Sequence, residues 1–324
     1  MSATDRIIAP IADDMEKFEP YFRASMKNNV PLLSLITNYI LRTKGKQMRP
    51  MLVFLSAKLV GQICDSTYNA AALIELLHTA TLIHDDVVDE SSHRRGFFSI
   101  NALWKSKVAV LVGDFFLSKG LLLAVEKSEF ALLKIVSDAV REMSEGELLQ
   151  IEKSRKLNIT EEIYYEIIRK KTATLIAACT SSGAKSTGAN DEVVEKMRLF
   201  GEYIGMAFQI KDDIFDYQKN MFTGKPSGND IKEKKLTLPL IHVLEKISPS
   251  QKKQILSTIR NHHDNPKKVN EIMEFVVSNG GLDYAIEKMN LYKKQALDLL
   301  NTFENNDASK ALTELANYTT DRNK

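Results

Sequence analysis

Apolar residues recur at offsets of three and four along much of this chain, which is the spacing of one face of an α-helix. No alternating run is long enough for a sheet, and the sequence has no repeat of fixed period and no heptad seam. Only 14 glycines and 8 prolines interrupt 324 residues, which suits long helices joined by short connections. The sequence therefore predicts an all-α fold. The pattern is clearest at Leu132, Ile135, Val136, Ala139, Val140 and Met143.

Composition bounds the class of protein. A hydrophobic content of 44% can fill one large core, so we expect one helical domain over residues 1–324. The 44 Lys and Arg residues nearly balance the 42 Asp and Glu residues. Because the net charge is small, no overall electrostatic attraction to nucleic acid or anionic lipid is expected. Cys64 and Cys179 lack metal-ligand spacing and are interpreted as reduced structural residues, as expected in the cytoplasm.

Membrane segments are not expected. The N-terminus has no signal-peptide pattern. The apolar stretches Val108–Leu117 and Gly120–Val125 are interrupted by charges and are too short to span a bilayer. If the protein makes an apolar product, that product can still bring it to a membrane surface.

The first of two acidic clusters is formed by Asp85, Asp86 and Asp89. Asp85 and Asp89 share one side of a helix, where their repulsion costs only about 0.2–0.5 kcal/mol on a solvated surface. An exposed acidic turn would therefore need no explanation. Asp85 and Asp89 continue a helical stripe with His78, Thr81 and Leu82, and the preceding residues Ala70–Leu77 are almost wholly apolar. These two features indicate instead that the carboxylates close an inward face. Carboxylates there need a cation, and Mg²⁺ suits carboxylates combined with substrate phosphates.

The second cluster, Asp212, Asp213 and Asp216, repeats the spacing of the first. Each cluster ends a predicted helix and precedes a basic loop, at Glu90–Ser99 and at Met221–Lys235. Solvation explains one such cluster easily, but two with identical spacing are hard to explain in that way. Together they predict a site for Mg²⁺ and a phosphate ester.

Basic residues add two weaker signals. Lys171 lies beside Thr172 on an apolar helical face, where a lysine either extends to solvent or supplies fixed charge to a leaving diphosphate. Lys46 and Arg49 lie three apart in Gly45–Pro50, ahead of a helix whose free amides favour an anion. A solvated basic turn is the simpler interpretation of that segment taken alone.

Combined, these segments resemble the trans-prenyl diphosphate synthases of the polyprenyl synthetase family. The resemblance covers about residues 20–320, and its most specific element is the first aspartate cluster followed by Arg94-Arg95-Gly96. It implies a single large helical bundle of the class I isoprenoid synthase type with a central cavity. The matching segments are Gly45–Pro50, Asp85–Gly96, Lys171–Thr172, Gln209–Asp216 and Lys225–Lys235.

The resemblance also implies an activity. An allylic diphosphate, such as farnesyl diphosphate, would be condensed with successive isopentenyl diphosphate units to an all-trans polyprenyl diphosphate for quinone side chains. Departure of diphosphate would leave an allylic cation, which the double bond of isopentenyl diphosphate attacks, and no protein base is required. A homodimer is implied as well.

Roles for individual residues follow from the same resemblance. The Mg²⁺ ligands would be Asp85, Asp86, Asp89, Asp212 and Asp216. Isopentenyl diphosphate would bind Gly45, Lys46, Arg49, His78 and Arg95. The allylic substrate would bind Arg94, Lys171, Thr172, Gln209, Lys225 and Lys235, with Thr172 and Gln209 facing the cation. The catalytic set would be Asp85, Asp86, Asp89, Arg94, Lys171, Thr172, Gln209 and Asp212.

Product length is expected to depend on Leu77, Ala80 and Thr81, which precede the first cluster. In the family, bulky aromatic residues there shorten the product, so the small Ala80 and Thr81 predict a medium or long product in the octaprenyl range. A tunnel floor is expected at Leu73, Leu132, Leu133 or Val136. The alternatives are a short-chain farnesyl or geranylgeranyl diphosphate synthase, a non-catalytic partner subunit, a terpene cyclase or head-to-head synthase, and a helical scaffold without a site.

Overall fold

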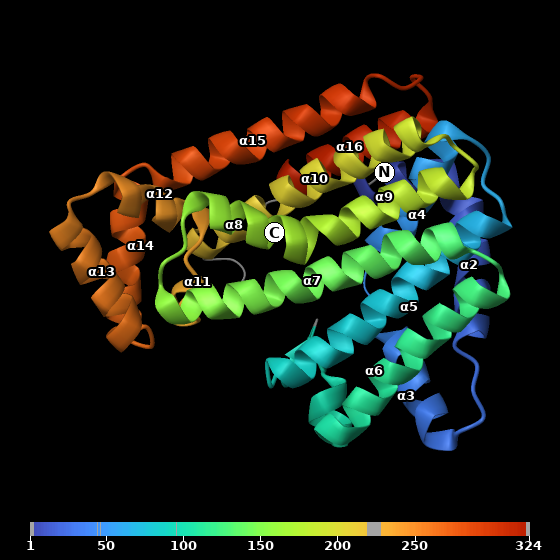
Figure 1. Cartoon of the computed structure of the whole chain (residues 1–324), viewed down its shortest axis with the longest axis horizontal. Coiled ribbons are helices and arrows are strands. Elements are labelled where there is room, and N and C mark those ends of the chain that lie inside the picture. Colours follow the sequence, from blue (N-terminus) through green and yellow to red (C-terminus); the bar gives the residue numbers. More distant parts are fainter. Residues whose placement is uncertain (1–2, 44, 46, 95, 219–227, 322–324) are drawn as a thin grey trace. The chain divides into compact units, whose positions relative to one another are not determined.

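The computed structural model describes residues 3–43, 45, 47–94, 96–218 and 228–321, which are almost wholly helical (Figure 1). The predicted all-α fold class is confirmed. Contacts divide the chain into two compact units, and the prediction of one domain stays a prediction. Unit 1 comprises Met1–Val140, Ala178–Arg198 and Phe303–Glu314, and unit 2 comprises Arg141–Ala177, Leu199–Thr302 and Leu315–Lys324.

The first part of the chain supplies most helices of unit 1. Helices α5 and α6 lie side by side (Figure 1), because Gly120 of α6 leaves room for the side chains of Leu73 and Leu77 from α5. Phe18, Phe54 and Phe116 are fully buried in this unit. The elements are α1 (Ala3–Ile8), η1 (Ala9–Ile11), α2 (Ala12–Ser25), α3 (Pro31–Arg42), α4 (Met48–Val60), α5 (Asp65–Val88) and α6 (Ile100–Glu126).

A small hairpin stands where the sequence predicts the loop Glu90–Ser99. Strand β1 (His93–Arg94) pairs antiparallel with β2 (Phe97–Phe98), with Arg94 opposite Phe97. Gly96 has a φ of +82°, which a glycine adopts at no steric cost in a tight turn. Strands of two residues are too short to leave an alternating pattern, so sequence periodicity could not predict them.

Helix α6 is unusually apolar. Of the described residues, it is the one helix whose length and composition would allow it to cross a bilayer, and only 33% of its most apolar window is buried. The two shorter apolar stretches identified in the sequence, Val108–Leu117 and Gly120–Val125, both lie within this one helix. Exposed side chains on α6 include Leu103, Val110, Leu111, Leu121, Leu122 and Val125.

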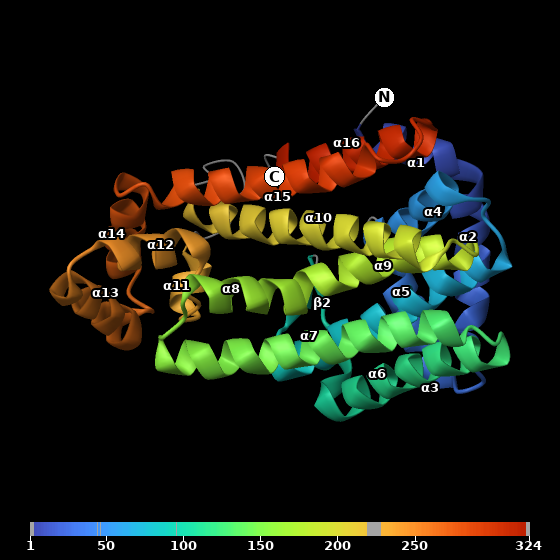
Figure 2. The ribbon, with the colours of Figure 1, turned by 45° about the horizontal axis from the view of Figure 1, so that its top comes forward.

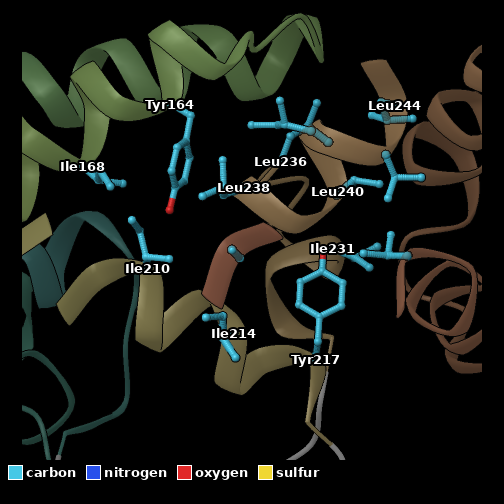
Figure 3. Close-up of a cluster of buried hydrophobic side chains, with 14 of the residues drawn as sticks. Tyr164, Ile168, Ile210, Ile214, Tyr217, Ile231, Leu236, Leu238, Leu240 and Leu244 are labelled. Carbon is cyan, nitrogen blue, oxygen red and sulfur yellow. The ribbon is translucent and has the colours of Figure 1, made fainter. Parts of the chain in front are cut away.

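Unit 2 has its own apolar core, shown in Figure 3, to which Tyr164, Ile210 and Leu238 contribute. Helices α12, α13 and α14 gather near one end of α15 (Figure 2). Four boundaries between the units fall inside α7, α9, α10 and α16, and the fifth falls between α15 and α16. The remaining elements are α7 (Phe130–Lys156), α8 (Glu161–Ile168), η2 (Arg169–Ala173), α9 (Thr174–Ser186), α10 (Asp191–Tyr217), α11 (Asn229–Lys232), α12 (Leu238–Lys246), α13 (Pro249–His262), α14 (Pro266–Ser278), α15 (Gly281–Leu300) and α16 (Asp307–Asp321).

Candidate active site

The first aspartate cluster lies at the C-terminal end of α5, with Asp89 as the C-cap. Asp86 is buried, with 3% of its surface exposed, whereas Asp85 and Asp89 are exposed. The helical spacing of Asp85 and Asp89 with His78 predicts that these two carboxylates lie on the inward face. The structure puts Asp86 there instead, because Asp86 continues the buried positions Ala80 and Ile83 at helical spacing. The helix dipole is negative at this end, so the three carboxylates together attract a cation.

The hairpin brings Arg94 to this cluster. Nε of Arg94 donates to Oδ1 of Asp86 at 2.8 Å, and Nη2 of Arg94 lies 2.8 Å from the same oxygen in an ion pair. Ser99 anchors the hairpin base, since its hydroxyl donates to the Ser91 carbonyl at 2.6 Å and its backbone N–H donates to the Ser92 carbonyl at 2.9 Å. A guanidinium is thereby held beside the carboxylates, and its predicted role in neutralising a diphosphate stays a prediction.

A pocket of about 750 Å³ in unit 1 adjoins the cluster. Asp86, Arg94 and the buried His78 line it, and Tyr39 and Phe97 contribute aromatic walls. Gln47 and Glu75 also line it, and sequence reasoning missed both. The position of Glu75, three residues before His78 on α5, was the available signal.

The other predicted isopentenyl diphosphate residues are only partly described. Gly45 and Arg49 are half-buried, and Arg49 lies in the first turn of α4. Lys46 and Arg95 lie outside the described residues. Their predicted contacts with isopentenyl diphosphate therefore stay predictions.

Lys171 and Thr172 lie in η2, a single stretch of π-helix between α8 and α9. Such stretches are rare and occur often at functional sites. Two glycines allow neighbouring backbones to approach it. A Cβ at Gly205 of α10 would lie 2.5 Å from the Cα of Ala173, and a Cβ at Gly146 of α7 would lie 2.9 Å from the backbone N of Lys171. Glycine at both positions thus permits the close packing around η2.

Side chains of η2 are held by defined partners. Lys171 forms an ion pair with Glu147, and its Nζ donates to Oε1 of Gln150 at 3.1 Å. The hydroxyl of Thr172 donates to Oε1 of Gln209 at 2.8 Å. Lys171 therefore does not simply extend into solvent, which was the alternative left open by the sequence.

A second pocket, of about 560 Å³, lies in unit 2. It brings together four of the six predicted allylic-substrate residues, while Arg94 lines the pocket of unit 1 and Lys225 lies outside the described residues. Apolar side chains, such as Ile159 and Leu236, form part of its wall. The predicted residues in the pocket are Lys171, Thr172, Gln209 and Lys235, and Asp213 and Asp230 join them.

The second aspartate cluster ends α10, and its members differ in their surroundings. Asp213 is buried, with 5% exposed, whereas Asp212 and Asp216 are half-buried. Asp216 caps α11, since its two carboxylate oxygens accept the backbone N–H groups of Asn229 at 2.9 Å and Asp230 at 3.0 Å. A carboxylate has about four lone-pair sites, so this cap leaves acceptor capacity for a cation.

Burial perturbs two carboxyl groups in this pocket. Burial, together with repulsion from Asp212 and Asp216, raises the pKa of Asp213 to about 7, although hydrogen bonds from Tyr164 and Gln209 oppose the rise. Burial, together with repulsion from Asp213 and Asp216, raises the pKa of Asp230 to about 8. Perturbed carboxyl groups in a pocket are typical of functional sites. Sequence reasoning missed Asp230, because its segment was interpreted only as a basic loop.

The donor set fits Mg²⁺. The predicted ligands, Asp85, Asp86, Asp89, Asp212 and Asp216, offer only carboxylate oxygens, which this hard cation prefers. Among the described residues, no group of three or more His, Cys, Asp or Glu side chains forms a ready-made metal cage. Mg²⁺ does not require one, since it is commonly held by one or two carboxylates together with substrate phosphates and water.

Comparison with known proteins agrees with the pattern of residues. The family model described as Polyprenyl synthetase matches residues 30–276. The chain belongs to the polyprenyl synthetase family. It is 35% identical to the all-trans-nonaprenyl-diphosphate synthase (geranyl-diphosphate specific) of Rhodobacter capsulatus, over 98% of this chain and 97% of that protein. It is 33% identical to the octaprenyl diphosphate synthase of Escherichia coli, over 97% of each chain.

Solved structures of polyprenyl synthetases share the fold. A decaprenyl diphosphate synthase from Rhodobacter capsulatus has a TM-score of 0.92 at 32% identity and covers 99% of both chains. A geranylgeranyl pyrophosphate synthase from Bacteroides thetaiotaomicron has a TM-score of 0.85 at 37% identity, over 99% of this chain and 100% of that chain. The predicted isoprenoid synthase fold is thus confirmed. The product lengths in the names of these relatives differ. Membership of the family therefore indicates a prenyl diphosphate synthase, but it does not determine the length of the product.

Proposed function

We propose that this polyprenyl synthetase uses Mg²⁺ to condense an allylic diphosphate with successive isopentenyl diphosphate units, giving an all-trans polyprenyl diphosphate in the octaprenyl range. The observation that carries the proposal is the unit 2 pocket, where Lys171 and Lys235 offer positive charge beside Thr172 and Gln209. An anionic leaving group and a developing carbocation need these two kinds of partner. A farnesyl primer and use of the product as a quinone side chain are part of the proposal.

Each substrate has a proposed set of partners in this chain. Asp85, Asp86, Asp89, Asp212 and Asp216 would hold Mg²⁺, which supplies Lewis-acid stabilisation of the departing diphosphate. Arg94, Lys171, Lys225 and Lys235 neutralise that group, and the oxygens of Thr172 and Gln209 face the allylic cation. Gly45, Lys46, Arg49, His78 and Arg95 bind isopentenyl diphosphate.

The same residues explain why no protein base is needed. The departed diphosphate, still held by the basic side chains, can accept the proton lost after the new carbon–carbon bond forms. Positioning and charge stabilisation then carry the catalysis. This leaves no task for His84 or His242 in the reaction.

Ligand binding offers a direct check of the metal-dependent site. With Mg²⁺ present, a non-reactive allylic diphosphate analogue at 100 times its Kd is expected to stabilise the protein against thermal unfolding by about 2.7 kcal/mol. Without Mg²⁺, the shift in Tm is expected to fall sharply. A helical scaffold without a site would show no shift with either addition.

Chain length is proposed from Leu77 and Ala80 of α5, the helix that lies beside α6. Leu77 and Ala80 are buried, and Leu77 packs over Gly120. We expect Ala80→Phe to shift the products to farnesyl or geranylgeranyl length, because the ring would fill the path of the growing chain. Thr81→Val, which nearly conserves volume, is the control and is expected to leave the products unchanged. Resolution of extracted products by length measures both, and an unchanged distribution in Ala80→Phe would contradict the assignment.

We also propose a cytoplasmic homodimer. The support for the dimer is the apolar surface of α6, where the exposed side chains are Val110, Leu111, Leu121, Leu122 and Val125. An extended apolar surface of this kind is typical of a protein interface. A second copy that covers it with its own α6 would form a two-fold contact of self-complementary faces.

A further inference from the structure

Four side chains of unit 2 form one chain of hydrogen bonds. The Thr172 hydroxyl donates to Oε1 of Gln209 at 2.8 Å, and Nε2 of Gln209 donates to Oδ1 of Asp213 at 2.9 Å. The Tyr164 hydroxyl donates to Oδ2 of Asp213 at 2.7 Å. The chain thus links η2, α10 and α8. Figure 3 shows Tyr164 projecting from α8 with its hydroxyl end directed towards the helix that carries Ile210.

Asp213 determines the direction of the hydrogen bonds that link these four side chains. Both carboxyl oxygens of Asp213 accept a hydrogen bond, Oδ2 from the Tyr164 hydroxyl and Oδ1 from Nε2 of Gln209. With its NH₂ group turned to Asp213, Gln209 can offer only its carbonyl oxygen to Thr172. The Thr172 hydrogen is therefore turned to Gln209, which leaves the lone pairs of its hydroxyl oxygen available to the pocket.

We infer that Tyr164 and Asp213 are positioning residues that fix the polarity of the Thr172–Gln209 pair, so that the pair presents oxygen lone pairs to a positively charged carbon. This inference rests on the proposed function, since a prenyl transfer forms such a carbon at this pocket. A preorganised dipole aimed at the charge that develops needs no reorientation during the reaction. Asp213 acts here through its two partners rather than as a metal ligand.

The surroundings of Tyr164 suit this task. Tyr164 and Asp213 are both nearly completely buried, at 3% and 5% exposed. Water therefore has little access to replace the Tyr164 hydroxyl at Oδ2 of Asp213. Without that hydroxyl, the carboxylate is free to rotate towards another donor, and Gln209 is free to turn its amide over.

The test compares two diphosphate probes that differ in the charge of the chain. One is farnesyl thiolodiphosphate, whose chain is uncharged, and the other is a farnesyl diphosphate analogue with a protonated nitrogen in place of the cationic carbon. Calorimetric titration of the full-length protein with Mg²⁺ gives the Kd of each. We expect Tyr164→Phe to lower the preference for the cationic probe by about tenfold, the size of one good hydrogen bond, with the Kd of the uncharged probe within about twofold of wild type.

Two further variants make the test specific. Tyr165→Phe removes a hydroxyl from the next position of α8 and is expected to keep the wild-type preference. Asp213→Asn conserves shape but relaxes the demand that both partners donate, so it is expected to lose the preference as Tyr164→Phe does. An unchanged preference in both Tyr164→Phe and Asp213→Asn would overturn the inference and leave the proposed function standing. Wild-type protein that binds neither probe would overturn both.

Discussion

Asp85→Asn is expected to lower kcat by about 10³-fold and to leave Tm unchanged. Asp85 is exposed at the end of α5, so folding does not depend on burying its carboxylate. In the proposed reaction, Asp85 helps to hold Mg²⁺ where charge develops on the departing diphosphate. Loss of several kcal/mol of stabilisation there corresponds to a rate decrease of this size. Steady-state kinetics at saturating Mg²⁺ and a thermal melt provide the two measurements.

A matched control for Asp85 is available in the same unit. Asp138 on α7 is also a partly exposed carboxylate, and it forms a surface ion pair with Lys134. Asp138→Asn is expected to change neither kcat nor Tm appreciably, because exposed pairs of this kind contribute little. Equal kcat values for Asp85→Asn and Asp138→Asn would contradict the role proposed for the first cluster.

Gly205→Ala is expected to lower both kcat and stability. A Cβ at this position would lie 2.5 Å from the Cα of Ala173 and 2.8 Å from its Cβ, so α10 and η2 must move apart. Such overpacking costs about 1–3 kcal/mol of unfolding free energy. Since Thr172 and Lys171 lie in η2, a displacement of about 1 Å is expected to lower kcat about 10²-fold.

The Gly183→Ala variant separates the effect of lost stability from the effect of displacing η2. A Cβ at Gly183 would lie 2.3 Å from the Val53 carbonyl oxygen in unit 1, so this variant should lose comparable stability. Its kcat, measured well below its Tm, is expected to stay near the wild-type value because η2 is untouched. If Gly205→Ala retained wild-type kcat below its Tm, the packing around η2 would have no role in placing Thr172 and Lys171.

Much of the fold and of the site was predictable from local patterns. Helical spacing and the scarcity of Gly and Pro indicated the all-α class, because both depend on neighbouring residues along the chain. Side chains in matching motifs, such as Lys171, Thr172, Gln209 and Lys235, do meet in one pocket. Arg94, which follows the first aspartate cluster in sequence, also contacts Asp86 at the end of α5.

Other features depend on partners distant in sequence, which spacing alone does not encode. The spacing of Asp85 and Asp89 showed that they share a side of α5, but not that Asp86 would be the buried member. Tyr164 shares an apolar helical face with Lys171, and that spacing does not predict its contact with Asp213, which joins α8 to α10. The π-helix η2 packs closely against Gly146 and Gly205, and the local sequence gives no signal for its geometry or for these contacts.

Product analysis tests the central claim most directly. Purified protein would be incubated with Mg²⁺, farnesyl diphosphate and labelled isopentenyl diphosphate, and the extracted lipids would be resolved by chain length. We predict Mg²⁺-dependent incorporation of label into octaprenyl-range products. Products no longer than geranylgeranyl would contradict the proposed chain length while keeping the chemistry, and an absence of incorporation despite tight diphosphate binding would contradict the synthase itself and favour a non-catalytic partner subunit.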